Sequence, residues 1–441
     1  MRPSPVTFRG EHLVVGALLL LFVSRAVIAD RVVPPWQGPD EPTHFVLSYV
    51  LTLPREVQRR GVETQVLDAM DRHGWWELYG REKKYPVPWF DGVEGLGSGT
   101  LEHPLYYGIA AATLTVTRPH DLDTAYRHLR ALSVVLSALA LLLGWTGARH
   151  LLGAEAALAA TALAALNPQF LLAAITVNAD ALLNALGALL WWQTTRSFAN
   201  DRRAVSLILI LLTGVAAALT KRLGVVLFVV ASLMVVQSLA TTRHWRASRR
   251  SLLLTLFAAG LAVVTVLVAW SLFDRQFEQL LVTWRDAVTV RQPLQETTAA
   301  DAITTTTSMV DYWWLIAGWL RFPAPEAWMW IARAITVVGL AGAAAALFDA
   351  SGREQRLWVP WLFVTSHVAA VAAVTLWTVQ AAPQGRYLFP VIVPTCVLIY
   401  AGTARVVPAP AHRYWPMCLV AVVAALDISG LALVLIPAYA P

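Results

Sequence analysis

Two adjacent acidic residues, Asp40 and Glu41, lie in the segment Pro39–His44, just beyond the first apolar run of the chain. Adjacent carboxylates can bind a divalent cation, accept a proton from an attacking hydroxyl group, or do both. The same residues also suit the start of a helix, with Asp40 as N-cap and proline at an early helical position. Because carboxylates beside a hydrocarbon layer are costly unless they line a watery or protein-walled cavity, we predict a functional site here.

Other candidate residues lie far from this acidic pair in the sequence. His103 precedes a proline and could bind a metal or donate to a phosphate, although a loop histidine more often has a backbone partner. Asp180 stands where two apolar segments meet, a place where a single aspartate is usually a helix cap. Its expected position on the same membrane face as Asp40 favours a functional role.

Three cations could contact an anionic substrate. Lys221 and Arg222 interrupt a long apolar stretch, and they are either snorkelling side chains or a clamp for a phosphate at headgroup depth. Arg386 lies between Gly385 and Tyr387 at the start of a late apolar segment. Glycine there allows close backbone approach, and arginine offers bidentate contacts to phosphate. An arginine on the outer face runs against the usual cytoplasmic bias, which favours a function for Arg386.

The composition predicts an all-α polytopic membrane protein. Of 441 residues, 57% are hydrophobic and 14% charged, and the mean hydropathy is +0.57. Apolar runs of about twenty residues recur along the chain without period-two alternation, which favours helices over a barrel. The charge of +6 comes mainly from arginine between these runs, with no basic run interleaved with aromatics, so nucleic acid is not expected as a partner. Neither cysteine suggests a disulfide framework.

Clusters of arginine predict the cytoplasmic loops of a plasma-membrane protein. They place the N-terminus inside and the C-terminus outside, with residues 1–29 as a retained signal anchor. The chain is then a single integral membrane domain with about eleven spans, in a range of eleven to thirteen. The expected spans are 12–29, 129–149, 154–168, 179–196, 204–220, 223–240, 251–273, 328–348, 357–379, 386–404 and 415–437.

Two large loops are expected on the outer face, at residues 30–128 and 274–311. The first should hold juxtamembrane helices, including an amphipathic helix at 41–60. Residues 104–117 are apolar but short. If they span the membrane, Asp180 moves inside; if they form a juxtamembrane helix, Asp40, Glu41, His103, Asp180 and Arg386 share the outer face. In the second arrangement more of the arginine clusters keep their predicted cytoplasmic position, and we prefer it.

Together these motifs resemble the GT-C superfamily of integral membrane glycosyltransferases, including protein O-mannosyltransferases and aminoarabinose-type lipid-linked sugar transferases. A closer resemblance is to an uncharacterised branch, the domain-of-unknown-function 2142 membrane proteins. The similar segments run in order from residue 39 to residue 390: Pro39–Phe45, Asn167–Phe170, Val177–Asp180, Leu219–Arg222 and Gln384–Pro390. Leu105 stands where the transferases often have a second proline.

The resemblance implies a GT-C-like bundle that transfers a sugar from a polyprenyl-phosphate donor to a lipid, glycan or protein acceptor on the outer face, among membrane lipids. Catalytic roles would fall to Asp40, Glu41 and Asp180. Substrate contacts would come from His44, His103, Lys221, Arg222, Arg386 and Tyr387. A divalent cation, if one is used, would be held by Asp40, Glu41 and His103.

Two other functions fit parts of the same pattern. In a transporter of a lipid-linked glycan or small molecule, the acids would serve as proton or cation relays. That class usually places acids within mid-bilayer helices, as Asp427 is here, whereas Asp40, Glu41 and Asp180 are expected at helix ends. In a non-catalytic subunit of cell-envelope assembly, the 30–128 loop would bind a partner protein.

Overall fold

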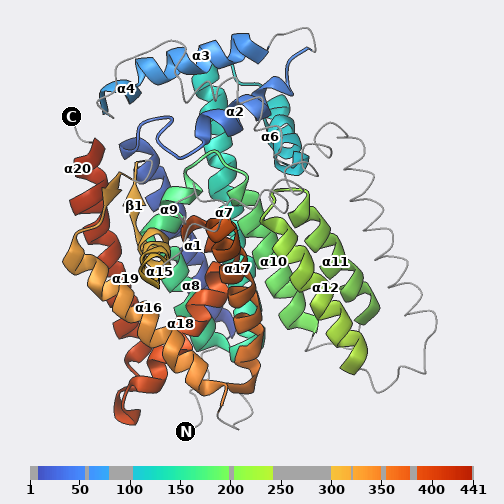
Figure 1. Cartoon of the computed structure of the whole chain (residues 1–441), viewed down its shortest axis with the longest axis vertical. Coiled ribbons are helices and arrows are strands. Elements are labelled where there is room, and N and C mark those ends of the chain that lie inside the picture. Colours follow the sequence, from blue (N-terminus) through green and yellow to red (C-terminus); the bar gives the residue numbers. More distant parts are fainter. Residues whose placement is uncertain are drawn as a thin grey trace.

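The computed structural model describes residues 8–54, 59–78, 103–197, 203–241, 299–318, 321–348, 354–377 and 385–439. Long helices lie side by side along one axis, and shorter helices collect at one end (Figure 1). The described residues form helices almost throughout, with one two-stranded sheet. The expected all-α membrane fold is therefore confirmed. The predicted span 251–273 and residues 274–298 of the second loop lie outside the described residues.

The helices of the N-terminal half run to residue 241. In chain order they are α1 (Phe8–Val32), α2 (Glu41–Val50), α3 (Arg59–Arg72), α4 (Trp75–Leu78), α6 (Pro104–Thr117), α7 (Leu122–Leu152), α8 (Ala154–Ala165), α9 (Pro168–Ala174), α10 (Asp180–Ser197), α11 (Arg203–Ala218) and α12 (Gly224–Thr241). Helix α7 packs along much of α10, and α11 packs against α12.

The C-terminal half begins with α15 (Ala299–Trp314) and a short antiparallel pair, β1 (Ile316–Ala317) and β2 (Phe322–Pro323). The remaining elements are α16 (Glu326–Ala346), η2 (Glu354–Leu357), α17 (Trp358–Trp377), η3 (Gly385–Val391), α18 (Ile392–Val406), η4 (Ala409–Ala411), α19 (Trp415–Gly430), η5 (Leu431–Leu435) and α20 (Ile436–Tyr439). Helix α16 packs along α18, which also contacts α8.

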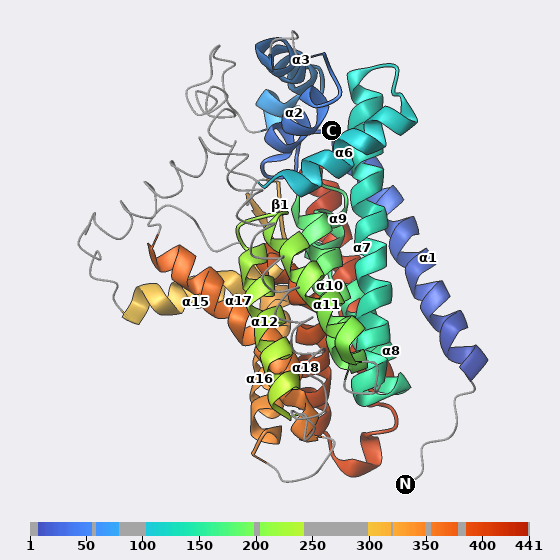
Figure 2. The same cartoon turned by 90° about the vertical axis from the view of Figure 1, so that its right-hand side faces the viewer.

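The short helices α2, α3, α4 and α6 lie beyond the ends of the long helices, at the end of the molecule where α20 also finishes (Figures 1 and 2). Helix α1 begins at the opposite end. The expected helices within residues 30–128 are thus present, and 104–117 is a helix of its own, packed on α2 and α7. Residues 299–311 of the expected second loop are helical and belong to α15.

Five helices among the described residues are long and apolar enough to cross a membrane, or six if the bent pair α8–α9 forms one span. Helices correspond to all of the expected spans that lie in the described ranges, but α10, α11, α12 and α17 do not meet the criteria of length and composition. The total of about eleven crossings stays a prediction.

Proline and capping residues account for the differences between the expected and observed helices. The amphipathic helix expected at 41–60 is wrong: α2 ends at Val50, and residues 51–54 form a turn before α3 (Arg59–Arg72). Pro54 lies in the intervening turn and disfavours helical conformation in the residue before it. Likewise, the span expected at 154–168 bends by 66° between α8 and α9, where Asn167 caps α9 and Pro168 opens it.

Two further boundaries differ from those expected. Helix α7 begins at Leu122 rather than near 129, because the Asp121 side chain accepts a hydrogen bond from the Thr124 amide (2.7 Å). The segment expected to be a helix from 386 starts as the 3₁₀ turn η3, which contains Pro390, and becomes α-helical only at Ile392.

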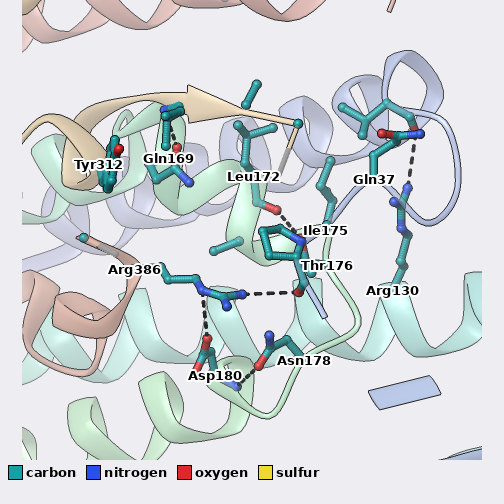
Figure 3. A pocket seen from close by; sticks show the side chains of 18 of the residues that line it. Gln37, Arg130, Gln169, Leu172, Ile175, Thr176, Asn178, Asp180, Tyr312 and Arg386 are labelled. Carbon is teal, nitrogen blue, oxygen red and sulfur yellow. Dashed lines mark hydrogen bonds and ion pairs between the residues drawn. The ribbon is translucent and has the colours of Figure 1, made fainter. Parts of the chain in front are cut away.

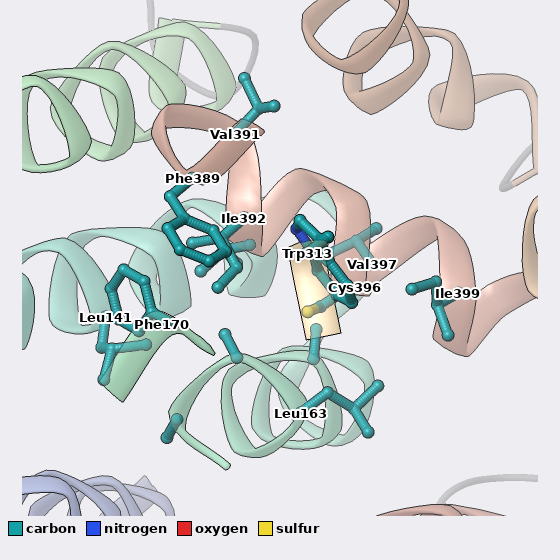
Figure 4. Close-up of a cluster of buried hydrophobic side chains, with 14 of the residues drawn as sticks. Leu141, Leu163, Phe170, Trp313, Phe389, Val391, Ile392, Cys396, Val397 and Ile399 are labelled. Carbon is teal, nitrogen blue, oxygen red and sulfur yellow. The ribbon is translucent and has the colours of Figure 1, made fainter. Parts of the chain in front are cut away.

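One of two apolar clusters lies where α18 packs on α8 and η3 packs on α9 (Figure 4). Phe389 is fully buried and meets Phe170 edge to face, and Cys396 is enclosed beside them. One ion pair is also buried within the long helices: the Arg25 guanidinium of α1 donates to the Asp427 carboxylate of α19 and to the Ala165 carbonyl oxygen (2.6 Å). Charges at this depth persist only when they are paired, and this pair joins the first long helix to the last.

Glycine 385 permits the close approach that places the next residue, Arg386. A Cβ atom at this position would collide with the backbone of Tyr312 and Trp313. We expect Gly385→Ala to lower the free energy of unfolding by about 1 to 3 kcal/mol, the usual cost of overpacking, and to displace Arg386. Gly16→Ala in α1, where a Cβ has nothing within 4 Å, is the control and should leave the melting temperature in detergent unchanged or raised. Equal melting temperatures for both variants would contradict this role of Gly385.

Candidate functional site

Four charged side chains from four separate segments form a chain of alternating sign. Lys221 Nζ donates to Asp180 Oδ1 (2.7 Å), and Arg386 Nη2 donates to Asp40 Oδ2 (2.7 Å). Arg386 Nε lies 3.8 Å from Asp180 Oδ2, so Arg386 joins the two carboxylates. We call Lys221, Asp180, Arg386 and Asp40 the charge quartet. The contacts bring these four residues together at one end of the molecule, while their position on the outer membrane face stays a prediction.

Asp40 occupies a strained position at the start of α2. Its φ of 66° is in the left-handed region, which aspartate tolerates better than most residues. Glu41 follows inside the first turn of the helix, and the two neighbouring side chains therefore point in different directions. The Asp40 side chain is 52% exposed, whereas Glu41 is fully buried. Backbone strain of this kind is retained where the surrounding structure holds it, often at functional sites.

The neighbours of Asp40 favour its ionised form. Enclosure by the surrounding protein works against ionisation, but the positive charges of Arg386, then of His44 and Lys221, outweigh it. They hold the pKa of the Asp40 carboxyl below its usual range. Asp40 Oδ2 faces Arg386, while Oδ1 makes no hydrogen bond to a described residue. This leaves an ionised carboxylate oxygen available at the surface of the site.

A pocket that opens to solvent adjoins the quartet, and its cavity volume is about 50 Å³. It is bounded by the turn before α2, by α9 and the segment that follows it, by the residues around β1, and by Arg386 and Tyr439. Figure 3 shows Asp180, Asn178 and Arg386 grouped together, with Gln169 and Tyr312 on another side of the same pocket.

Glu41 belongs to a separate, fully buried network. Its Oε1 accepts from the Val177 amide (2.9 Å) and Arg130 Nε (3.2 Å). Its Oε2 accepts from the Gly38 amide, the Tyr126 hydroxyl (both 2.9 Å) and Arg130 Nη2 (3.3 Å). With both oxygens occupied by donors, the carboxylate of Glu41 is suited to fixing the turn before α2 rather than to exchanging a proton with a substrate.

Arg130, which was not among the candidate residues chosen from the sequence, completes that network. Its guanidinium also donates to Asp30 Oδ1 (2.8 Å) and lies over the Tyr126 ring, 4.7 Å from its centroid. The network therefore ties the end of α1, the start of α2 and the first turns of α7 together. A signal was available in the sequence, since an arginine at the start of a long apolar run is costly unless it is paired. Asn178 was noted only as part of a motif.

The remaining predicted residues lie at different distances from the quartet. His44 is buried one turn after Asp40, and its Nδ1 contacts the Tyr107 hydroxyl (2.8 Å). The Tyr387 ring lies between two cations, 5.6 Å from Lys221 Nζ and 5.5 Å from the Arg386 guanidinium carbon. Arg222 is exposed and forms no ion pair with a described residue. His103 contacts the Ala218 carbonyl oxygen through Nδ1, beside the turn that carries Lys221.

The metal site predicted from Asp40, Glu41 and His103 is not assembled. Among the residues that the structure describes, no three His, Cys, Asp or Glu side chains come together in a way that could hold a metal ion. The physical reason is local: donors already occupy both oxygens of Glu41, and His103 is bound to the end of α11.

Comparison with known families gives a match to the predicted membrane proteins called DUF2142 over residues 98–395, about two thirds of the chain. The chain belongs to the DUF2142 family. The matched region contains Asp180, Lys221 and Arg386, while Asp40, Glu41 and His44 precede it. No curated protein matches this DUF2142 chain.

Among solved structures, the chain is similar to the oligosaccharyltransferase of Archaeoglobus fulgidus in several states. The complex with Zn and sulfate has a TM-score of 0.38 and 12% identity, over 74% of this chain and 44% of that chain. The complex with an inhibitory peptide and a dolichol-phosphate has a TM-score of 0.38 and 11% identity, over 74% of this chain and 47% of that chain. This DUF2142 chain thus spans less than half the length of these neighbours.

Proposed function

We propose that this protein is a membrane glycosyltransferase that moves a sugar from a polyprenyl-phosphate donor to a hydroxyl group of a lipid, glycan or protein acceptor. The observation that carries the proposal is the ionised, half-exposed Asp40 carboxylate, held by Arg386 beside a pocket that opens to solvent. A carboxylate general base and a cation for a leaving phosphate are the two groups that such a transfer requires.

The reaction can be written with these groups. Asp40 Oδ1 accepts the proton of the acceptor hydroxyl as its oxygen bonds to the anomeric carbon of the sugar. The bond from that carbon to the phosphate oxygen breaks, and polyprenyl phosphate leaves with the electron pair. Arg386 Nη1 makes only a long contact with the Pro39 carbonyl oxygen (3.4 Å), so it can turn to the leaving phosphate. Lys221 adds positive charge nearby. Cations aimed at developing charge usually contribute a large share of catalysis.

The distribution of arginine supports an outer-face site. The arginines Arg149, Arg196, Arg356, Arg405 and Arg413 flank helix ends that lie at the end of the bundle opposite the charge quartet. Arginine collects on the cytoplasmic side of membrane proteins. The resemblance of the sequence motifs to GT-C transferases points to the same face and to a lipid-linked donor. In this proposal Glu41 fixes the turn before α2, and Asp180, His44, His103, Arg222 and Tyr387 contact the substrate.

The proposal is tested by mass spectrometry of lipids that remain bound to gently purified wild-type and Asp40→Asn protein. A variant that binds the donor without consuming it should retain a polyprenyl-phosphate sugar, and its mass would identify the sugar. Absence of any prenyl phosphate from both samples would count against the transferase. In that case, counterflow in proteoliposomes without bond cleavage would support a transporter.

The proposal also predicts a change in pH dependence. A base must be ionised to act, so transfer should fail only when the pH drops below the lowered pKa of Asp40. Enclosure opposes ionisation, and Arg386 is the largest influence that lowers this pKa. Arg386→Gln should therefore raise the pKa of Asp40 and move the acidic limb of the pH–rate profile to higher pH. Arg413→Gln, at an exposed site at the other end, should leave the limb in place. An unmoved limb in Arg386→Gln would exclude Asp40 as the titrating base.

A further inference from the structure

Three buried polar atoms at the pocket beside the quartet have no hydrogen-bond partner: Asn178 Nδ2, Asp180 Oδ2 and Arg386 Nε. Their residues are between 2% and 7% exposed. Buried groups of this kind cost free energy when they are left unsatisfied. Their presence together on one side of one pocket (Figure 3) indicates a ligand that supplies the missing hydrogen bonds.

The chemistry of the three atoms restricts that ligand. Arg386 Nε is a donor, Asp180 Oδ2 is an acceptor, and the two atoms lie 3.8 Å apart. A hydroxyl group is able to accept from the first and donate to the second at the same time. A phosphate or carboxylate oxygen has no proton to donate, and it would meet the negative charge of Asp180. Asn178 Nδ2 supplies a further donor for the oxygen of a second hydroxyl.

The rest of the pocket suits the carbon face of a small ring. Leu172, Ile175 and Ile316 contribute apolar surface, and Tyr312 and Tyr439 lie at the margins. Pro39, the residue before Asp40, also lines the pocket. A sugar ring bound there would therefore lie next to the Asp40 carboxylate. Sites that combine apolar walls with a few fixed polar groups are typical of small-molecule recognition.

We infer that this pocket binds the sugar ring of the donor, that the sugar is neutral and bears neighbouring hydroxyl groups, and that Asn178, Asp180 and Arg386 select it. This inference rests on the proposed function and adds the class of sugar. A substitution at Asn178 can separate the expected ligand contact from the structural one. Its Oδ1 accepts the Asp180 amide (2.9 Å) at the start of α10, while its Nδ2 is left for the ligand. Serine can keep the first interaction through its hydroxyl oxygen and removes the second.

The test compares ligand affinities in nanodiscs. The probes are citronellyl phosphate and the same lipid carrying glucose, mannose, galactose, arabinose or glucuronic acid. Wild type should bind at least one neutral-sugar lipid more tightly than the bare phosphate and should disfavour glucuronic acid. Asn178→Ser should weaken binding of the preferred sugar lipid by roughly 2- to 10-fold, the effect of one hydrogen bond, without changing the affinity for citronellyl phosphate. Gln193→Ser, which removes an amide from α10 away from the pocket, should change neither affinity.

Each other result contradicts the inference. Equal affinities of wild type for the bare and sugar-bearing lipids would exclude a sugar pocket while leaving a lipid-phosphate substrate in place. An equal loss of both affinities in Asn178→Ser would assign Asn178 to the fold alone. No binding of any probe to wild type would overturn both this inference and the proposed function.

Discussion

Asp40→Asn should reduce sugar transfer by about 10²- to 10⁴-fold, the usual contribution of a positioned general base. Asparagine has nearly the same shape, and it tolerates the left-handed backbone that Asp40 adopts, with φ of 66°. It can also accept a hydrogen bond from Arg386, but it cannot accept the proton of the acceptor. Transfer should be followed with the lipid donor identified by mass spectrometry, and folding by the melting temperature.

Asp121→Asn provides a matched control. Asp121 is an exposed acid that caps α7, and asparagine serves equally well as an N-cap. The variant should transfer sugar at the wild-type rate. Full activity of Asp40→Asn would exclude Asp40 as the base, whereas a large fall in its melting temperature would assign it to the fold.

Glu41→Gln should destabilise the protein by about 3 to 5 kcal/mol, the range found when one partner of a buried ion pair is removed. Both oxygens of Glu41 accept from donors, and Arg130 approaches each of them. An amide group at this position would lose the charge that neutralises Arg130 and would turn its own N–H groups toward other donors. The measurement is the free energy of unfolding in detergent micelles from denaturant titration.

Glu326→Gln is the control for that experiment. The Glu326 side chain is 69% exposed and contacts Arg333, so the loss of its charge should change the free energy of unfolding by less than about 0.5 kcal/mol. If Glu41→Gln keeps wild-type stability but abolishes transfer, Glu41 takes part in the chemistry, and the positioning role assigned to it here is wrong.

The sequence was sufficient for most of the architecture because apolar runs predict long helices whatever their partners. It was also sufficient to place Asp40, Asp180, Lys221 and Arg386 at one end, since arginine bias constrains the direction of each helix. The residues at which helices end were harder to predict. Pro54 and the Asn167–Pro168 pair are ordinary breaking signals, yet they lie within otherwise continuous patterns that favour a longer helix.

The sequence could not distinguish the roles of Asp40 and Glu41. Two neighbouring acids look alike until the backbone direction at Asp40 and the position of Arg130 are known. Arg130 lies 89 positions from Glu41 in the sequence, and the Val177 amide lies 136 positions away. The sequence also could not predict which polar atoms at the pocket lack a hydrogen-bond partner, because the neighbours of each side chain are set by tertiary packing.

The buried pair of Arg25 and Asp427 bears on how the chain is made. Arg25 enters the membrane with α1, and its carboxylate partner in α19 follows 402 positions later. Throughout elongation the first helix carries an uncompensated cation, which is costly within lipid. A chain that stops before α19 retains that defect permanently. The pair therefore makes the stable packing of α1 depend on α19, a helix that is synthesised long after it.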